Sequence, residues 1–119
     1  MSFKILVVDD ASFVRMMIHQ VLVGLGHTDI LEGKNGLEAI ELYQENRPAL
    51  TIMDITMPEL DGLSALREIV ALDPSAKVII CSGVAQVNVV NEALELGAIE
   101  FVAKPFYVEE LGRIITKYL

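Results

Sequence analysis

Five short apolar segments recur along the chain and alternate with longer stretches in which hydrophobic residues repeat at helical spacing. Most of these segments are rich in β-branched residues and contain no polar alternation, which is typical of strands buried on both faces of a parallel sheet. The predicted strands lie at residues 5–8, 29–31, 50–53, 78–81 and 99–102. The second segment is the shortest and most mixed, so we expect it nearer an edge of the sheet.

A stripe of apolar residues at i, i+3, i+4 and i+7 spacing follows each predicted strand and indicates an amphipathic helix. The stripes are Val14, Met17, Ile18, Val21 and Leu25; Leu37, Ile40 and Tyr43; Leu63, Leu66, Ile69 and Val70; Val90, Ala93 and Leu94; and Val108, Leu111, Ile115 and Tyr118. Gly24 or Gly26 ends the first helix and Gly97 the fourth. Five β–α units joined by short right-handed crossovers predict an α/β fold, a doubly wound parallel sheet with helices on both faces.

The composition adds limits on the domain and its partners. A chain of 119 residues fits one domain, and we expect that domain to span residues 1–119 with no output domain after the fifth helix. Seventeen acidic against nine basic residues give a net charge of −8, which argues against nucleic-acid or anionic-membrane partners. Cys81 is the only cysteine and the start of the chain lacks signal-peptide organisation, so we expect a cytoplasmic protein. We also expect a monomer.

Polar residues follow four of the five predicted strands. Asp9 and Asp10 come directly after the first, Asp54 after the third, Ser82 after the fourth and Lys104 after the fifth. The carboxyl ends of parallel strands meet at one edge of the sheet, so we expect these side chains to lie together. Three carboxylates repel one another unless a cation lies among them, and ligands that are all oxygen favour Mg²⁺.

A divalent cation, an ammonium and a hydroxyl around one carboxylate form a suitable set for phosphoryl transfer. The carboxylate can itself be the nucleophile. Asp54 is favoured because its strand would be central in a doubly wound sheet of order 2-1-3-4-5. Each residue alone has an ordinary structural explanation. Helix or turn capping could explain the pair Asp9 and Asp10, and it could equally explain Asp54 or Ser82. Lys104 could simply lie on the surface. Their order at successive strand ends favours the functional interpretation.

Four motifs give the chain a family resemblance over its whole length. Residues 7–10 (VVDD), 53–62 (MDITMPELDG), 81–83 (CSG) and 101–106 (FVAKPF) resemble the response-regulator receiver domains of two-component signalling. Residues 12–17 (SFVRMM) make the chain most similar to the stand-alone chemotaxis regulators of this family. The resemblance implies a flavodoxin-like five-stranded sheet in the order 2-1-3-4-5, and a cis peptide bond between Lys104 and Pro105.

The resemblance also implies a role for each acidic residue. Asp54 would be the phosphoacceptor. Mg²⁺ would be bound directly by Asp10 and Asp54, through water by Asp9, and by the backbone carbonyl of Thr56.

Three further residues would respond to phosphorylation, according to the same resemblance. Ser82 would hydrogen-bond one phosphoryl oxygen and Lys104 would pair with another. Phe101 would be the aromatic switch that turns inward when Ser82 is drawn to the phosphoryl group. Ser82 stands where threonine is commoner, and Phe101 where the best-known chemotaxis members have tyrosine. The switch would therefore depend on ring packing without a phenol hydrogen bond.

The function that the resemblance implies is a phosphorylation-activated signalling switch and not an enzyme. A chemotaxis-type histidine kinase would donate the phosphoryl group, the flagellar motor switch or another protein would be the target, and a phosphatase could remove the group. Two alternatives stay open: a receiver of another phosphorelay or one excised from a multidomain regulator, and a haloacid-dehalogenase-like phosphohydrolase. The second would need Asp-x-Asp after the first strand, where this chain has adjacent Asp9 and Asp10.

Overall fold

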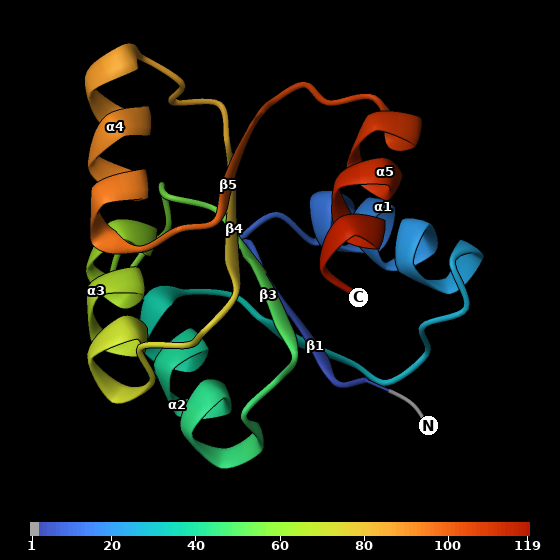
Figure 1. Cartoon of the computed structure of the whole chain (residues 1–119), viewed down its shortest axis with the longest axis horizontal. Coiled ribbons are helices and arrows are strands. Elements are labelled where there is room, and N and C mark those ends of the chain that lie inside the picture. Colours follow the sequence, from blue (N-terminus) through green and yellow to red (C-terminus); the bar gives the residue numbers. More distant parts are fainter. Residues whose placement is uncertain (1–2) are drawn as a thin grey trace.

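A five-stranded parallel sheet forms the centre of the protein in a computed structural model that describes residues 3–119 (Figure 1). The strands are β1 (Ile5–Val8), β2 (Ile30–Gly33), β3 (Leu50–Met53), β4 (Val78–Ser82) and β5 (Glu100–Ala103), and the helices are α1 (Ser12–Gly24), α2 (Gly36–Asn46), α3 (Gly62–Leu72), α4 (Val87–Leu96) and α5 (Val108–Tyr118). The sheet order is β2-β1-β3-β4-β5. The predicted fold class and strand order are confirmed.

The helices form two layers, with α1 and α5 on one face of the sheet and α2, α3 and α4 on the other (Figure 1). Successive residues of a strand point to opposite faces. In β1, Ile5 and Val7 join the core under α1 and α5, whereas Leu6 and Val8 join the core under α2, α3 and α4. Burial on both faces explains why the inner strands β1, β3 and β4 are largely apolar. None of the helices within residues 3–119 is long and apolar enough to cross a membrane.

The structure corrects several details of the sequence prediction. β2 and β5 each begin one residue later than expected, and β4 continues to Ser82. Four residues of the predicted helical stripes are exposed and do not belong to the core: Leu25, Leu37, Leu94 and Val108. They lie in or next to the first or last turn of their helices, where the sheet no longer covers the side chain. The residue after α4 is Gly97, whose φ of 118° is left-handed, as expected for a helix stop.

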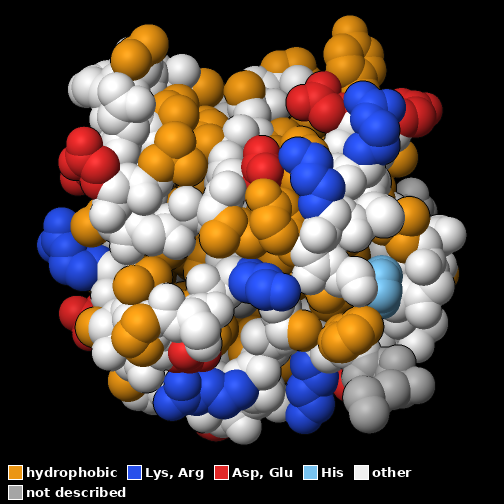
Figure 2. All heavy atoms as spheres, in the orientation of Figure 1, with side chains coloured by type: hydrophobic (Ala, Val, Ile, Leu, Met, Phe, Trp, Pro, Cys, Tyr) orange, Lys and Arg blue, Asp and Glu red, His pale blue; other side chains and the backbone are white. Residues whose placement is uncertain are grey.

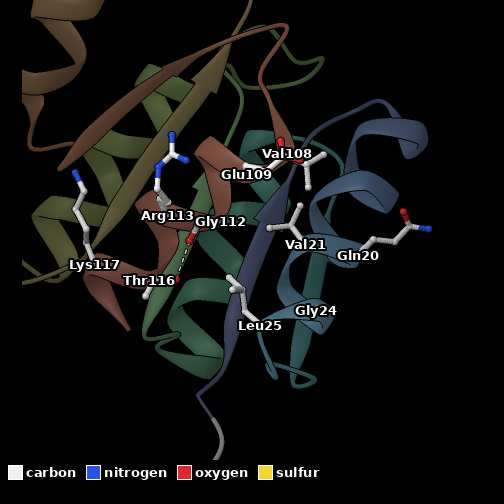
Figure 3. Close-up of a pocket in the computed structure, with 10 residues that line it drawn as sticks. All are labelled: Gln20, Val21, Gly24, Leu25, Val108, Glu109, Gly112, Arg113, Thr116 and Lys117. Atoms are coloured by element: carbon white, nitrogen blue, oxygen red, sulfur yellow. Dashed lines mark hydrogen bonds between the residues drawn. The ribbon is translucent and has the colours of Figure 1, made fainter.

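A groove of about 670 Å³ is lined by residues of α1 and α5 (Figure 3). Val21 and Leu25 line one wall and Val108 lies on the other. The groove is open because Gly24 and Gly112 have no side chains there: a Cβ at Gly24 would meet nothing within 4 Å. On the face shown in Figure 2, hydrophobic side chains reach the surface between Lys and Arg side chains. None of the residues predicted to carry the chemistry lines this groove.

Candidate functional site

The three acidic residues meet at the carboxyl ends of the adjacent strands β1 and β3. One carboxylate oxygen from each of Asp9, Asp10 and Asp54 lies within 4.8 Å of the other two. Asp9 and Asp54 are only 2% and 7% exposed, whereas Asp10 lies on the surface. The structure therefore brings together the carboxylates that the strand pattern placed at one edge of the sheet.

The backbone after β3 fixes the orientation of Asp54. Its Oδ1 accepts a 2.7 Å hydrogen bond from the N–H of Ile55, and its own N–H donates to the carbonyl of Val8 at 3.0 Å. The returning chain lies directly against this turn, with the N–H of Gly62 donating to the Ile55 carbonyl at 2.7 Å. A Cβ at Gly62 would collide with the carbonyl oxygen of Asp54, so only glycine fits. This packing leaves Oδ2 of Asp54 facing the rest of the cluster.

Lys104 supplies the positive charge of the site. Its Nζ donates to Oδ2 of Asp9 at 2.7 Å and to Oδ2 of Asp54 at 3.2 Å. Burial opposes the charged form, but the hydrogen bond to Asp9 and the charges of both carboxylates raise the pKa of Lys104 above its ordinary value. The peptide bond to Pro105 is cis, as the family resemblance implied. Lys104 is thus an internal counter-ion and does not have the surface position considered for it.

Ser82 and the acidic pair do not cap helices in the ordinary way. The hydroxyl oxygen of Ser82, which is fully buried, accepts a 3.1 Å hydrogen bond from the N–H of Val84, and the N-cap of α4 is Gln86. The N-cap of α1 is Ala11, whose N–H donates to Oδ1 of Asp9 at 2.9 Å. The capping explanation therefore fails for Ser82 and accounts for only one oxygen of Asp9.

Phe101 lies close to Ser82 in the sheet. In the β4–β5 register, Phe101 is opposite Ile80 and Ser82 is opposite Ala103, so both side chains point to the face under α2, α3 and α4. Phe101 is half-buried and packs against that core.

The electrostatics and the ligand types of the cluster fit Mg²⁺. Three carboxylates and the single ammonium of Lys104 leave two negative charges uncompensated, the charge of one divalent cation. All the available ligand atoms are oxygens, the type that Mg²⁺ prefers. Thr56 is exposed in the loop after β3, and its carbonyl accepts no hydrogen bond from residues 3–119. It has a free lone pair to offer.

Arg15 contacts the site and Glu32 contacts Arg15, and neither residue was predicted to do so. Arg15 Nη1 donates to the backbone carbonyl of Asp9 at 2.6 Å, and its Nε donates to Oε1 of Glu32 at 3.0 Å. The strand-end pattern could not find a residue inside α1. The available signal was the position of Arg15 about one turn into the helix, since helical side chains lean toward the helix N-terminus and thus toward the preceding loop.

Comparisons with known proteins agree on one family. The model of the response regulator receiver domain matches residues 5–116. The chemotaxis protein CheY of Bacillus subtilis is 45% identical over 100% of this chain and 99% of its own. The sporulation initiation phosphotransferase F of the same organism is 33% identical over 100% of this chain and 95% of its own.

Solved structures show the same likeness in three dimensions. CheY in the CheX–CheY–BeF3–Mg²⁺ complex of Borrelia burgdorferi superposes with a TM-score of 0.92 and 30% identity, covering 98% of this chain and 90% of that one. The receiver domain of the Pseudomonas aeruginosa histidine kinase PA1611, which has a magnesium ion in its active-site cleft, gives a TM-score of 0.88 and 29% identity over 99% and 98%. The chain therefore belongs to the response regulator receiver domain family and is of the CheY type.

Proposed function

We propose that this protein is a phosphorylation-activated switch in which Asp54 accepts the phosphoryl group of a kinase phosphohistidine. The observation that carries the proposal is the environment of the Asp54 carboxylate. One oxygen is held by the N–H of Ile55, and the other faces Lys104 and the two acidic residues after β1. A buried carboxylate held in this way is preoriented to react through its second oxygen.

The reaction is an in-line displacement at phosphorus. Oδ2 of Asp54 forms the new P–O bond as the P–N bond of the phosphohistidine breaks, and the electron pair of that bond returns to the imidazole nitrogen. The ammonium of Lys104 and the hydroxyl of Ser82 stabilise the charge on the phosphoryl oxygens. Lys104 is already within 3.2 Å of the attacking oxygen, so it needs little movement to do so.

We assign Mg²⁺ to the acidic cluster, with Asp10, Asp54 and the Thr56 carbonyl as direct ligands and Asp9 bound through water. The bound cation would supply positive charge beside the incoming phosphoryl group. The uncompensated charge of the cluster supports this assignment, as does the magnesium ion in the cleft of the PA1611 receiver domain.

The proposed partners follow from the relatives. A histidine kinase of the chemotaxis type is the donor, and the flagellar motor switch or a comparable protein is the target. The identity to a chemotaxis CheY is 45% against 33% to a sporulation phosphotransferase, which favours chemotaxis over a relay. The Borrelia CheX–CheY complex supports a further partner of the CheX kind, for which we propose the phosphatase role.

The test is phosphorylation by acetyl phosphate and Mg²⁺, followed by intact-protein mass spectrometry. We expect one phosphoryl group on the wild type and none on Asp54→Asn. The matched control is Asp61→Asn in the loop after Asp54, because asparagine can still accept the N-cap hydrogen bond from Ser64. Equal labelling of Asp54→Asn and wild type would place the acceptor elsewhere. Sustained turnover of p-nitrophenyl phosphate would instead indicate a phosphohydrolase.

A further inference from the structure

We propose that Arg15 is a positioning residue for the Mg²⁺ site and that Glu32 holds it in place. Arg15 would fix the peptide unit between Asp9 and Asp10, and so the direction of the Asp10 carboxylate. This inference rests on the proposed function, because it concerns the Mg²⁺ ligands assigned there.

Arg15 joins three elements at the carboxyl end of β1. The guanidinium belongs to α1, the carbonyl that it binds at 2.6 Å follows β1, and the carboxylate that it binds at 3.0 Å belongs to β2. The side chain of Arg15 is only 13% exposed. A planar guanidinium offers donors at fixed angles, so two such contacts determine its orientation. Arg15 thus links the edge strand β2 to the loop that carries Asp9 and Asp10.

Asp10 is the member of the acidic cluster whose orientation depends most on contacts made by its backbone. Both carboxylate oxygens of Asp9 and Asp54 accept hydrogen bonds within the site. Asp10 is exposed, and within residues 3–119 its carboxylate accepts no hydrogen bond. The Asp9 carbonyl belongs to the planar peptide unit that leads into Asp10. Holding that plane restricts the direction in which the Asp10 side chain leaves the backbone.

Glu32 is placed to orient Arg15 and to balance its charge. In the β1–β2 register Glu32 is opposite Val7, whose side chain points to the face under α1 and α5. Glu32 therefore points toward α1, where Nδ1 of His19 lies 3.6 Å from its second oxygen. Since Glu32 pairs with the guanidinium, Arg15 brings little net positive charge to the cation site.

A positioning role and a charge role predict opposite effects. An arginine that acted only by its charge would repel Mg²⁺, so its removal would tighten binding and Arg15→Lys would change nothing. An arginine that positions Asp10 cannot be replaced by lysine, whose ammonium lacks the planar fork. Both Arg15→Ala and Arg15→Lys would then weaken binding. The sign of the effect distinguishes the two roles.

The experiment measures Mg²⁺ dissociation constants by ¹H–¹⁵N NMR titration, since the chain has no tryptophan to report binding by fluorescence. We expect Arg15→Ala and Arg15→Lys to bind Mg²⁺ about tenfold more weakly, the usual effect of removing a residue that orients a metal ligand. Glu32→Gln keeps an acceptor oxygen for Arg15 but leaves the guanidinium charge unbalanced, so it should bind Mg²⁺ less tightly than wild type. Glu32→Ala also loses the orienting contact and should bind several-fold more weakly than wild type and more weakly than Glu32→Gln. Arg113→Ala, an exposed arginine on α5, is the matched control. The amide resonance of Asp10 should also shift in the metal-free Arg15 variants.

Two further measurements separate the failures. The free energy of unfolding in EDTA shows whether a variant is merely less stable, and unchanged Mg²⁺ affinity in a destabilised Arg15 variant overturns the positioning role. Asp10→Asn tests the Mg²⁺ site itself. If wild type and Asp10→Asn bind Mg²⁺ equally, the ligand assignment is wrong and the role of Arg15 falls with it. If Asp10→Asn binds weakly but both Arg15 variants bind as tightly as wild type or more tightly, only the role of Arg15 is wrong.

Discussion

The backbone N–H of Val84 donates a 3.1 Å hydrogen bond to the hydroxyl oxygen of Ser82. A hydroxyl that accepts one hydrogen bond still has its own proton to donate. Ser82 can therefore bind a phosphoryl oxygen on Asp54 and stay attached to Val84. Any movement of Ser82 toward that oxygen would draw along the loop that leads into α4.

This attachment leads to a prediction about the coupling between Ser82 and Phe101. Beryllofluoride with Mg²⁺ should shift the NMR resonances of Val84 and Phe101 in wild type. Val84 is hydrogen-bonded to Ser82, and the side chains of Ser82 and Phe101 share one face of adjacent strands. Ser82→Ala should lose most of these shifts and Ser82→Thr should retain them. Phe101→Leu should keep part of the Val84 shift and Phe101→Ala little of it, since an apolar side chain must fill the space that Ser82 leaves as it moves toward Asp54. Shifts of wild-type size at Phe101 in Ser82→Ala would contradict the coupling between Ser82 and Phe101. The control is Ser75→Ala.

Lys104 should make stability depend on alkaline pH. Its pKa is raised in the folded protein, so its stabilisation is complete below the unfolded value of about 10.4 and is lost as pH rises through the folded value. Lys104→Met should lower the free energy of unfolding by roughly 1–3 kcal/mol at pH 7 in EDTA. The difference in the free energy of unfolding between Lys104→Met and wild type should become smaller above about pH 10. Urea unfolding from pH 7 to alkaline pH measures this, with exposed Lys34→Met as control. A constant difference at every pH would refute the ion pairing.

Gly62 should tolerate no side chain. Gly62→Ala would press its Cβ against the carbonyl oxygen of Asp54, and the backbone shift should cost roughly 1–3 kcal/mol of stability. The rate of phosphorylation by acetyl phosphate should fall as well, because the turn that orients Asp54 moves. Gly24→Ala, where a Cβ meets nothing within 4 Å, should be neutral or stabilising. Wild-type stability in Gly62→Ala would show that the loop can yield.

Cys81 should be inert in the folded protein. Burial raises the pKa of its thiol to about 12, so almost no thiolate exists at neutral pH. We expect iodoacetamide at pH 8 to label the native protein far more slowly than the protein in guanidinium chloride. Intact mass against time measures both rates. Native labelling at the unfolded rate would mean that the thiol is accessible.

The sequence pattern was most informative where a strand is covered on both faces. The first and third strands were predicted to the residue, whereas the edge strand β2, half-exposed and containing Glu32, was displaced by one residue at its start. Helical spacing predicts that Leu37 belongs to a buried stripe, but it does not show where a helix leaves the sheet, and Leu37 is exposed. Arg15 was missed for a similar reason: its contact depends on Glu32, seventeen residues away, and only the fold brings the two together.

The two hydrophobic cores on opposite faces of the sheet have a consequence for how such a protein can diversify. Ser82 and Phe101 lie on the face under α2, α3 and α4, whereas Arg15 and Glu32 lie on the face under α1. The sheet separates the two sets, and the acidic cluster at its edge is where they meet. Substitutions around α4 can thus change which target protein is bound while leaving cation binding unchanged. Substitutions around α1 can change cation binding while leaving the choice of target protein unchanged.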